Sequence, residues 1–282
     1  WTQLENSPHL SPELKAVAKK AQAYDFKPTA VSGKTRLQAI RDFLSTAGPP
    51  TAAYPNGSPI EDSFSQPLRN WQGSGGNSDA SGNIRVRAAL FALKGKALGQ
   101  NSDKVTQERE FWQETMGNDS EIFNKNWNLG SSQAMALIPY IAATQQRLEQ
   151  TVKESTIVDA QGNKTTDKYI TMYRGLVNGS KFNKVSDRVK AALAKYGQGR
   201  VIKGGTDKGK TQVYNYILHG DSISGWSYKK NKAETFTHSS TGGILYRKGG
   251  LRIQDVLIDF NAFGHDGFTE EAEALVDTDA VT

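Results

Sequence analysis

The hydrophobic pattern changes its period near residue 152, and this change constrains the fold more than any other feature of the chain. Before this point, apolar residues recur every three or four positions, as they do on one face of a helix. After it, short runs alternate apolar and polar residues, as in half-buried strands. Segregated helices and strands are typical of an α+β fold and argue against a doubly wound sheet.

Helical spacing in the first part is strongest over residues 131–152, where a serine can cap the first turn and Pro139 would introduce a kink. Further helices are predicted over residues 12–24, 34–44, 87–93 and 106–116. Residues 48–82 are rich in Pro, Gly, Ser and Asn, which predicts a linker or a long irregular loop.

This linker is the expected domain boundary. It divides the chain into an N-terminal helical region, residues 1–84, and a second domain, residues 85–282. Phe64, Leu68 and Trp71 lie inside the linker and can hold part of it against a surface. The N-terminal region is a candidate for target recognition or for binding a secretion chaperone, and a simple packing extension is the alternative.

In the second domain, strands are predicted at 168–176, 213–218, 243–246 and 256–260, with one helix at 184–196. The last predicted strand covers residues 268–276 and contains a Glu-x-Glu pair. Alternation along a strand places Glu271 and Glu273 on one face. Phe268 precedes them, next to a glycine-rich loop, which is a common place for functional residues.

Composition excludes several kinds of site. The chain has no cysteine, so disulfides, zinc–thiolate centres and thiol nucleophiles are excluded, and its His residues lack the spacing of a metal site. The net charge is +6, but the basic residues are scattered, which favours dispersed surface charge over a nucleic-acid site. We expect no membrane span, because no apolar run is long enough. The start at Trp1, without a leader, indicates a trimmed or processed product.

Two further clusters follow predicted strands. Tyr173-Arg174-Gly175 combines a guanidinium fork, which suits a phosphate or diphosphate, with a glycine that lets a ligand approach the backbone. Taken alone, an exposed arginine is the simpler interpretation. Ser222–Tyr228 is a small polar cluster in which aromatic residues flank Ser227, and a turn is the simpler interpretation there.

An aromatic-Arg-Gly, a serine near a strand and a Glu-x-Glu strand, in this order, resemble the arginine–serine–glutamate class of mono-ADP-ribosyltransferases. Bacterial toxins and effectors are its best-known members. The resemblance covers residues 168–276, with 53 residues from Arg174 to Ser227 and 46 more to Glu273. It implies an ADP-ribosyltransferase-like fold, in which a helical lobe starting near Arg85 precedes a split, mostly antiparallel β-sandwich.

The resemblance also implies roles for these residues. NAD is the ADP-ribose donor, and cleavage of its ribosyl–nitrogen bond builds positive charge on the sugar, which a carboxylate stabilises. Glu273 is expected in that role, and Glu271 would orient or deprotonate the acceptor. Arg174 would hold the NAD phosphates and ribose, and Gly175 the nicotinamide amide through its backbone. Ser227 would position Glu273.

Some positions remain open at this stage. Ser224 is the alternative to Ser227, because the compact Ser-Thr-Ser of the family is absent. Trp226, Tyr228 or Phe236 would stack on nicotinamide, with a place in the core as the simpler interpretation. Phe268 would belong to the turn that recognises the acceptor. No metal is implied.

The expected activity is transfer of ADP-ribose from NAD to a host protein, by a secreted bacterial effector acting in the host cytoplasm. Glu-x-Glu usually accompanies arginine as the acceptor residue, and serine and threonine are alternatives. A small GTPase, actin, ubiquitin or another signalling protein would be the acceptor. The rival interpretations are an NAD glycohydrolase and a non-catalytic, basic protein-binding module.

Overall fold

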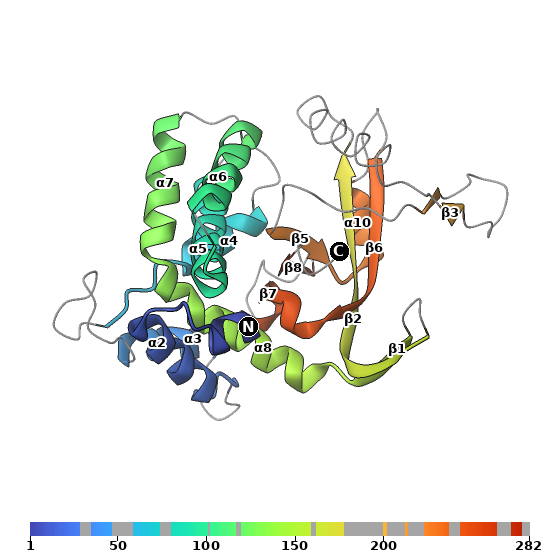
Figure 1. Ribbon diagram of the computed structural model, residues 1–282, viewed down its shortest axis with the longest axis horizontal. Coiled ribbons are helices and arrows are strands. Elements are labelled where there is room, and N and C mark those ends of the chain that lie inside the picture. The colour runs from blue at the N-terminus through green and yellow to red at the C-terminus, as the bar shows by residue number, and fades with distance from the viewer. Residues whose placement is uncertain are drawn as a thin grey trace.

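Helices and strands occupy different sides of the molecule in a computed structural model of the chain (Figure 1). The structure describes residues 1–28, 35–46, 59–73, 80–100, 102–116, 120–158, 162–177, 200–201, 212–213, 223–236, 243–263 and 272–277. The first part of the chain is helical and the second is mainly strands, so the predicted α+β class is confirmed.

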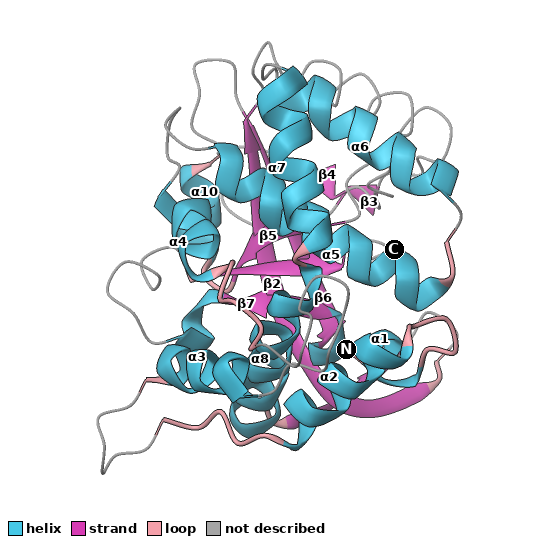
Figure 2. Cartoon of the chain, turned by 90° about the vertical axis from the view of Figure 1, so that its left-hand side faces the viewer, coloured by secondary structure: helices cyan, strands magenta, loops and turns pink. Residues whose placement is uncertain are grey.

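The helical part begins much as the sequence predicts. Its helices are α1 (Thr2–Asn6), α2 (Pro12–Ala23), α3 (Arg36–Thr46), α4 (Ser65–Gly73), α5 (Ala80–Leu98), α6 (Ser102–Met116), α7 (Ser120–Ser132) and α8 (Ile138–Thr151). Ser11 caps α2, because its Oγ accepts a hydrogen bond from the Leu14 amide at 3.4 Å. In the view of Figure 2, α5, α6 and α7 lie in front of the strands.

The prediction of one long helix over residues 131–152 is wrong. Helix α7 ends at Ser132, a 3₁₀ helix, η2, covers Ala134–Leu137, and α8 begins at Ile138. Pro139 therefore lies in the first turn of α8 and does not kink a longer helix. Proline is tolerated there because the amide hydrogen that it lacks has no partner within the helix.

The prediction of an irregular linker over residues 48–82 also needs correction. Helix α4 lies inside it, and α5 begins before its end, at Ala80. Phe64, Leu68 and Trp71 are buried, with exposed fractions of 0%, 1% and 8%. These side chains hold α4 against the rest of the protein, as their apolar character indicates.

The predicted boundary between residues 84 and 85 falls within α5. Residues on both sides of it share one hydrophobic core, which contains Val17 of α2 and Ile40 of α3 together with Leu90 of α5 and Leu275 near the C-terminus. The N-terminal residues therefore share their core with the rest of the protein, whereas a second cluster, around Met172 and Val276, comes from the C-terminal side alone.

The strands form an antiparallel sheet. Its members are β1 (Glu154–Val158), β2 (Lys164–Val177), β5 (Ile223–Ser227), β6 (Gly243–Arg252), β7 (Val256–Asp259) and β8 (Glu273–Asp277). The order is β1-β2-β5-β8-β7, and β6 also pairs with β2. A separate pair joins β3 (Arg200–Val201) to β4 (Gln212–Val213). The predicted helix 184–196 and most of the predicted strand 213–218 lie outside the described residues.

Strand β5 is the main difference from the sequence interpretation, which places a turn in this segment. It is an inner strand of the sheet, between β2 and β8. Glycine and serine weaken its strand propensity. However, a Cβ on Gly225 would lie 2.2 Å from the Oε1 atom of Glu273, so the small residue makes room for a carboxylate on the neighbouring strand.

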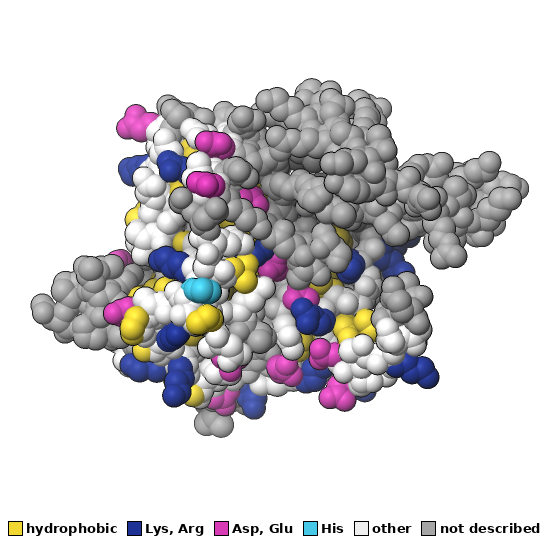
Figure 3. Space-filling model, in the orientation of Figure 1, with side chains coloured by type: hydrophobic (Ala, Val, Ile, Leu, Met, Phe, Trp, Pro, Cys, Tyr) yellow, Lys and Arg dark blue, Asp and Glu magenta, His cyan; other side chains and the backbone are white. Residues whose placement is uncertain are grey.

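Charged side chains are mixed on the surface. On the face shown in Figure 3, Lys and Arg alternate with Asp and Glu across the described part of the chain. This agrees with dispersed charge. Among the described helices, none combines the length and the apolar character that crossing a membrane requires.

Candidate functional site

Three neighbouring strands bring together the residues that the sequence picks out far apart along the chain. Tyr173 of β2 pairs with Ser227 of β5, and Ser227 in turn pairs with Glu273 of β8. Arg174 follows Tyr173 directly. An arginine, a serine and a glutamate therefore occupy adjacent strands at one place in the sheet.

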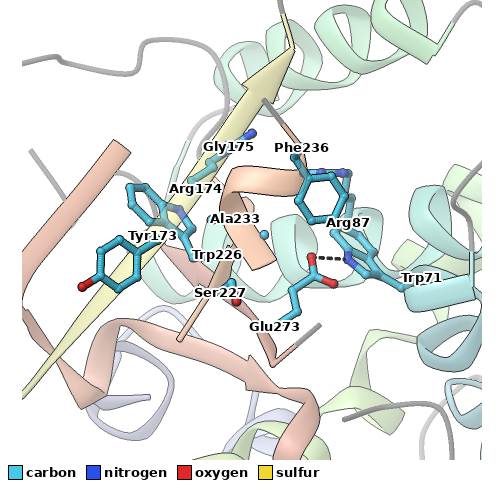
Figure 4. Close-up of a pocket in the computed structure, with 11 residues that line it drawn as sticks. Trp71, Arg87, Tyr173, Arg174, Gly175, Trp226, Ser227, Ala233, Phe236 and Glu273 are labelled. Atoms are coloured by element: carbon cyan, nitrogen blue, oxygen red, sulfur yellow. Dashed lines mark hydrogen bonds between the residues drawn. The ribbon is translucent and has the colours of Figure 1, made fainter. Parts of the chain in front are cut away.

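These residues surround a single pocket of about 200 Å³ (Figure 4). Its lining includes six residues predicted for the site: Arg174, Gly175, Trp226, Ser227, Phe236 and Glu273. It also includes Trp71, Arg87, Tyr173, Gly225 and Ala233. Two cationic side chains and one carboxylate thus face a common space, which suits a ligand with anionic groups and a centre that becomes positive.

The carboxylate of Glu273 contacts a helix through a hydrogen bond and lies close to the backbone of the neighbouring strand. The indole Nε1 of Trp71 donates a hydrogen bond to its Oε1 atom at 3.0 Å. Below it, Gly225 leaves the space that the carboxylate occupies. Glu273 is partly exposed and is the first residue of β8, so its side chain stands at the end of a strand and borders the pocket.

We expect Gly225→Ala to lower the NAD-cleaving activity that the sequence resemblance implies, while the protein remains folded. The new methyl group would lie 2.2 Å from the Glu273 Oε1 atom, so the carboxylate must move, and it can do so because it ends a flexible side chain. A displacement of this kind, of about 1 Å, costs about a hundredfold in rate. Nicotinamide release from NAD and thermal unfolding would be measured together.

Gly175→Ala is the matched comparison for this variant. A Cβ at Gly175 would lie 1.9 Å from the carbonyl oxygen of Ala233, which is backbone and cannot move freely. This variant should therefore lose thermal stability as well as activity. Equal rates for wild type and Gly225→Ala would show that the position of the carboxylate does not matter.

The structure distinguishes between the two candidate serines. Ser227 lines the pocket opposite Glu273, and its Oγ accepts a hydrogen bond from the Lys229 amide at 3.1 Å. Ser224 is fully buried, and its Oγ accepts a hydrogen bond from the Trp226 indole at 2.8 Å. Ser227 is therefore the serine next to the carboxylate, and Ser224 lies outside the pocket lining.

Gly175 allows a short helix to approach the sheet. Helix α10 (Lys230–Thr235) packs against β2 at this position, where a side chain would meet the Ala233 carbonyl. Phe236 follows the helix as its C-cap residue, is 45% exposed and lines the pocket. An exposed aromatic ring at a pocket rim is available to stack on a planar ligand.

Of the other two predicted stacking residues, neither presents a free ring to solvent. Trp226 is 3% exposed and packs in a core cluster with Met172 and Val276, so it lines the pocket from within the core. Tyr228 packs against the same cluster and lies outside the pocket lining. Burial raises the pKa of the Tyr228 hydroxyl, and the charge of Asp259 raises it further. For Trp226 and Tyr228, the simpler interpretation as core residues agrees with the structure.

The predicted strand over residues 268–276 begins later than expected. Strand β8 starts at Glu273, and Phe268 and Glu271 lie outside the described residues. Ala272 has a φ of 47°, in the left-handed region that non-glycine residues rarely adopt. In the described residues the strand alternation begins at Glu273, so the shared face of Glu271 and Glu273 stays a prediction. The expected role of Glu271 does not depend on that alternation and stays a prediction.

Sequence reasoning did not assign Trp71 and Arg87 to the site. Both come from helices that precede the sheet in sequence, and they belong to no part of the arginine–serine–glutamate pattern. The Arg87 guanidinium carbon lies 3.5 Å from the ring centroid of Trp112 and 4.7 Å from that of Trp71. Trp71, a tryptophan in a glycine- and serine-rich segment, was the only sign in the sequence. It predicts a packing contact but does not show which residue the tryptophan contacts.

The described residues contain no group of three or more His, Asp or Glu that could hold a metal ion. Comparison with known protein families, with curated proteins and with solved structures finds no match for this chain. The geometry of the site is therefore the main indication of its function.

Proposed function

We propose that this protein is a mono-ADP-ribosyltransferase that transfers ADP-ribose from NAD to a protein side chain. One observation carries the proposal: Arg174, Ser227 and Glu273 stand on three adjacent strands around one pocket, beside Gly175 and an exposed Phe236. Three short patterns from distant parts of the sequence lie together around this pocket, and their proximity supports the resemblance. If the three patterns matched the family only by chance, we would not expect their residues to lie close together in the fold.

The chemistry fits the charges of the pocket. The bond between ribose C1′ and the nicotinamide nitrogen breaks, its electron pair neutralises the pyridinium, and positive charge develops on the sugar. Glu273 stabilises that charge, and a positioned group of this kind is worth about a hundred- to a thousandfold in rate. The acceptor then forms a bond to C1′ and loses a proton, for which Glu271 is the proposed base.

Arg174 and Phe236 would bind the donor. The guanidinium of Arg174 suits the diphosphate, and Phe236 offers an exposed face for nicotinamide. Pockets that enclose drug-sized ligands measure about 300–1,000 Å³. Because this pocket measures about 200 Å³, its described lining encloses the reacting end of NAD rather than the whole dinucleotide.

The finer fold and the biological setting belong to the same proposal. Helices followed by an antiparallel sheet are compatible with an ADP-ribosyltransferase-like fold. The acceptor would be an arginine of a host protein, with serine or threonine as alternatives. The protein would act in the host cytoplasm as a secreted bacterial effector.

Labelled NAD tests the proposal directly. Purified protein incubated with NAD carrying label in its adenylate part and with a eukaryotic lysate should label a discrete protein and release nicotinamide. Arg174→Lys, which keeps the charge but loses the fork, should raise the KM for NAD. If nicotinamide is released but no protein is labelled, the proposal is wrong and the protein is an NAD glycohydrolase. If the protein neither releases nicotinamide nor labels another protein, the remaining interpretation is a non-catalytic binding module.

A further inference from the structure

We propose that Trp71 is a positioning residue for the catalytic carboxylate, and that Arg87, stacked between Trp71 and Trp112, holds it there. This inference rests on the proposed function, because it assigns a task to a residue that acts through Glu273. It also makes helix α4, which the sequence pattern treats as part of a linker, one wall of the reaction site.

The contact has the geometry of an orienting hydrogen bond. An indole nitrogen can only donate, and Trp71 Nε1 donates to Oε1 of Glu273 at 3.0 Å (Figure 4). One carboxylate oxygen is thereby fixed, and the rotation of the group is restricted. The carboxylate so held borders the pocket that the sugar of the donor would enter. Because the acceptor of this bond is a carboxylate, the bond favours its ionised form.

Trp71 itself is held by a guanidinium stack. Arg87 lies between the rings of Trp71 and Trp112, with its guanidinium carbon 4.7 Å and 3.5 Å from their centroids. Such cation–π contacts strengthen when the groups are removed from water. All three side chains are largely buried, with exposed fractions of 7–8%. The indole therefore cannot turn away from Glu273 without disturbing the stack.

The stack is tied to the strands that carry the site. Nη1 of Arg87 donates a hydrogen bond to the carbonyl oxygen of Ile223, the first residue of β5. Further along α5, Nζ of Lys94 pairs with Oδ1 of Asp277 on β8 at 2.7 Å, and both side chains are 7% exposed. Helix α5 thus fixes the helices relative to both strands, and Trp71 keeps its place relative to Glu273.

Two matched variants test the role of Trp71 in the full chain. Trp71→Phe removes the N–H donor and keeps an aromatic ring beside Arg87. Trp112→Phe changes the other ring of the same stack and leaves the hydrogen bond to Glu273 in place. For both variants, nicotinamide release would be measured as a function of NAD concentration and pH, together with thermal unfolding.

We expect Trp71→Phe to lower kcat about ten- to a hundredfold, the effect of losing a hydrogen bond to a charged group, with little change in the KM for NAD. The acid side of its pH–rate profile should move to higher pH, because the carboxylate loses a donor that favours its ionised form. Trp112→Phe should lower the melting temperature and leave the pH profile of the wild type unchanged.

The outcomes separate this inference from the proposed function. An active wild type, an inactive Glu273→Gln and a Trp71→Phe with wild-type kcat and pH profile would overturn the role of Trp71 alone. An equal shift of the pH profile in both tryptophan variants would also overturn it, because Trp112→Phe keeps the Trp71 N–H donor and the shift could not then come from losing that donor. A wild type that does not cleave NAD would overturn the proposed function, and this inference with it.

Discussion

Replacing Glu273 by glutamine is expected to lower kcat for nicotinamide release by about a hundred- to a thousandfold, while NAD still binds. In the proposed mechanism, the carboxylate supplies the negative charge that stabilises the developing sugar cation, and that charge acts mainly in the transition state. Glutamine has almost the same shape, and its amide oxygen can still accept the hydrogen bond from Trp71. The variant therefore removes the charge and keeps the contacts.

The measurement has two parts. Single-turnover nicotinamide release reports on the chemical step, and titration calorimetry with NAD reports on binding, so that a fall in kcat can be separated from a loss of affinity. The melting temperature of Glu273→Gln should stay close to that of the wild type. A variant that still releases nicotinamide at the wild-type rate would remove Glu273 from the mechanism.

Glu271→Gln is the comparison that separates the two proposed carboxylate roles. Its proposed task is to act on the acceptor, so the variant should lose protein labelling and keep much of its NAD hydrolysis. Parallel loss of both activities in the two variants would mean that the glutamates act as one unit.

The sequence predicts the candidate site better than it predicts the strand that holds its centre. Arg174, Ser227 and Glu273 are found because each belongs to a short pattern, and the order of the patterns is compatible with adjacent strands. The segment around Ser227 is interpreted as a turn because glycine and serine are common in turns. The glycine is there for a spatial reason, because Gly225 leaves room for the carboxylate of Glu273 on the neighbouring strand. Local sequence rules cannot predict a contact with a residue on another strand.

Contacts over long sequence distances explain what the sequence does not reveal. The hydrogen bond from Trp71 to Glu273 joins residues 202 positions apart, and the bond from Arg87 to Ile223 joins residues 136 positions apart. Periodicity describes which face of a helix is buried, but not which strand that face meets. The glycine-rich composition around α4 further hides a helix that packing, rather than local propensity, stabilises.

Deleting residues 1–84 is expected to abolish folding, and NAD hydrolysis and protein labelling with it. The cut removes the first turn of α5 and exposes the core surface that α1–α4 cover. Fully buried side chains such as Phe26, Ile40 and Phe64 contribute about 1.5–3 kcal/mol each. Their loss would expose the apolar core surface that they cover to water, which is a large cost for a protein of typical stability, about 5–15 kcal/mol.

Circular dichroism melting and nicotinamide release would test this expectation, with the full-length Trp71→Phe variant as the control. That variant loses the hydrogen bond to Glu273 and keeps the helices, so it should stay folded and retain reduced activity. The deleted chain should show no cooperative melting transition. If it folded and hydrolysed NAD but no longer labelled protein, residues 1–84 would be a separate target-recognition unit, and the shared core would contribute little to stability. The shared core and the hydrogen bond from Trp71 to Glu273 argue instead that the N-terminal helices belong to the same folded unit as the proposed catalytic site.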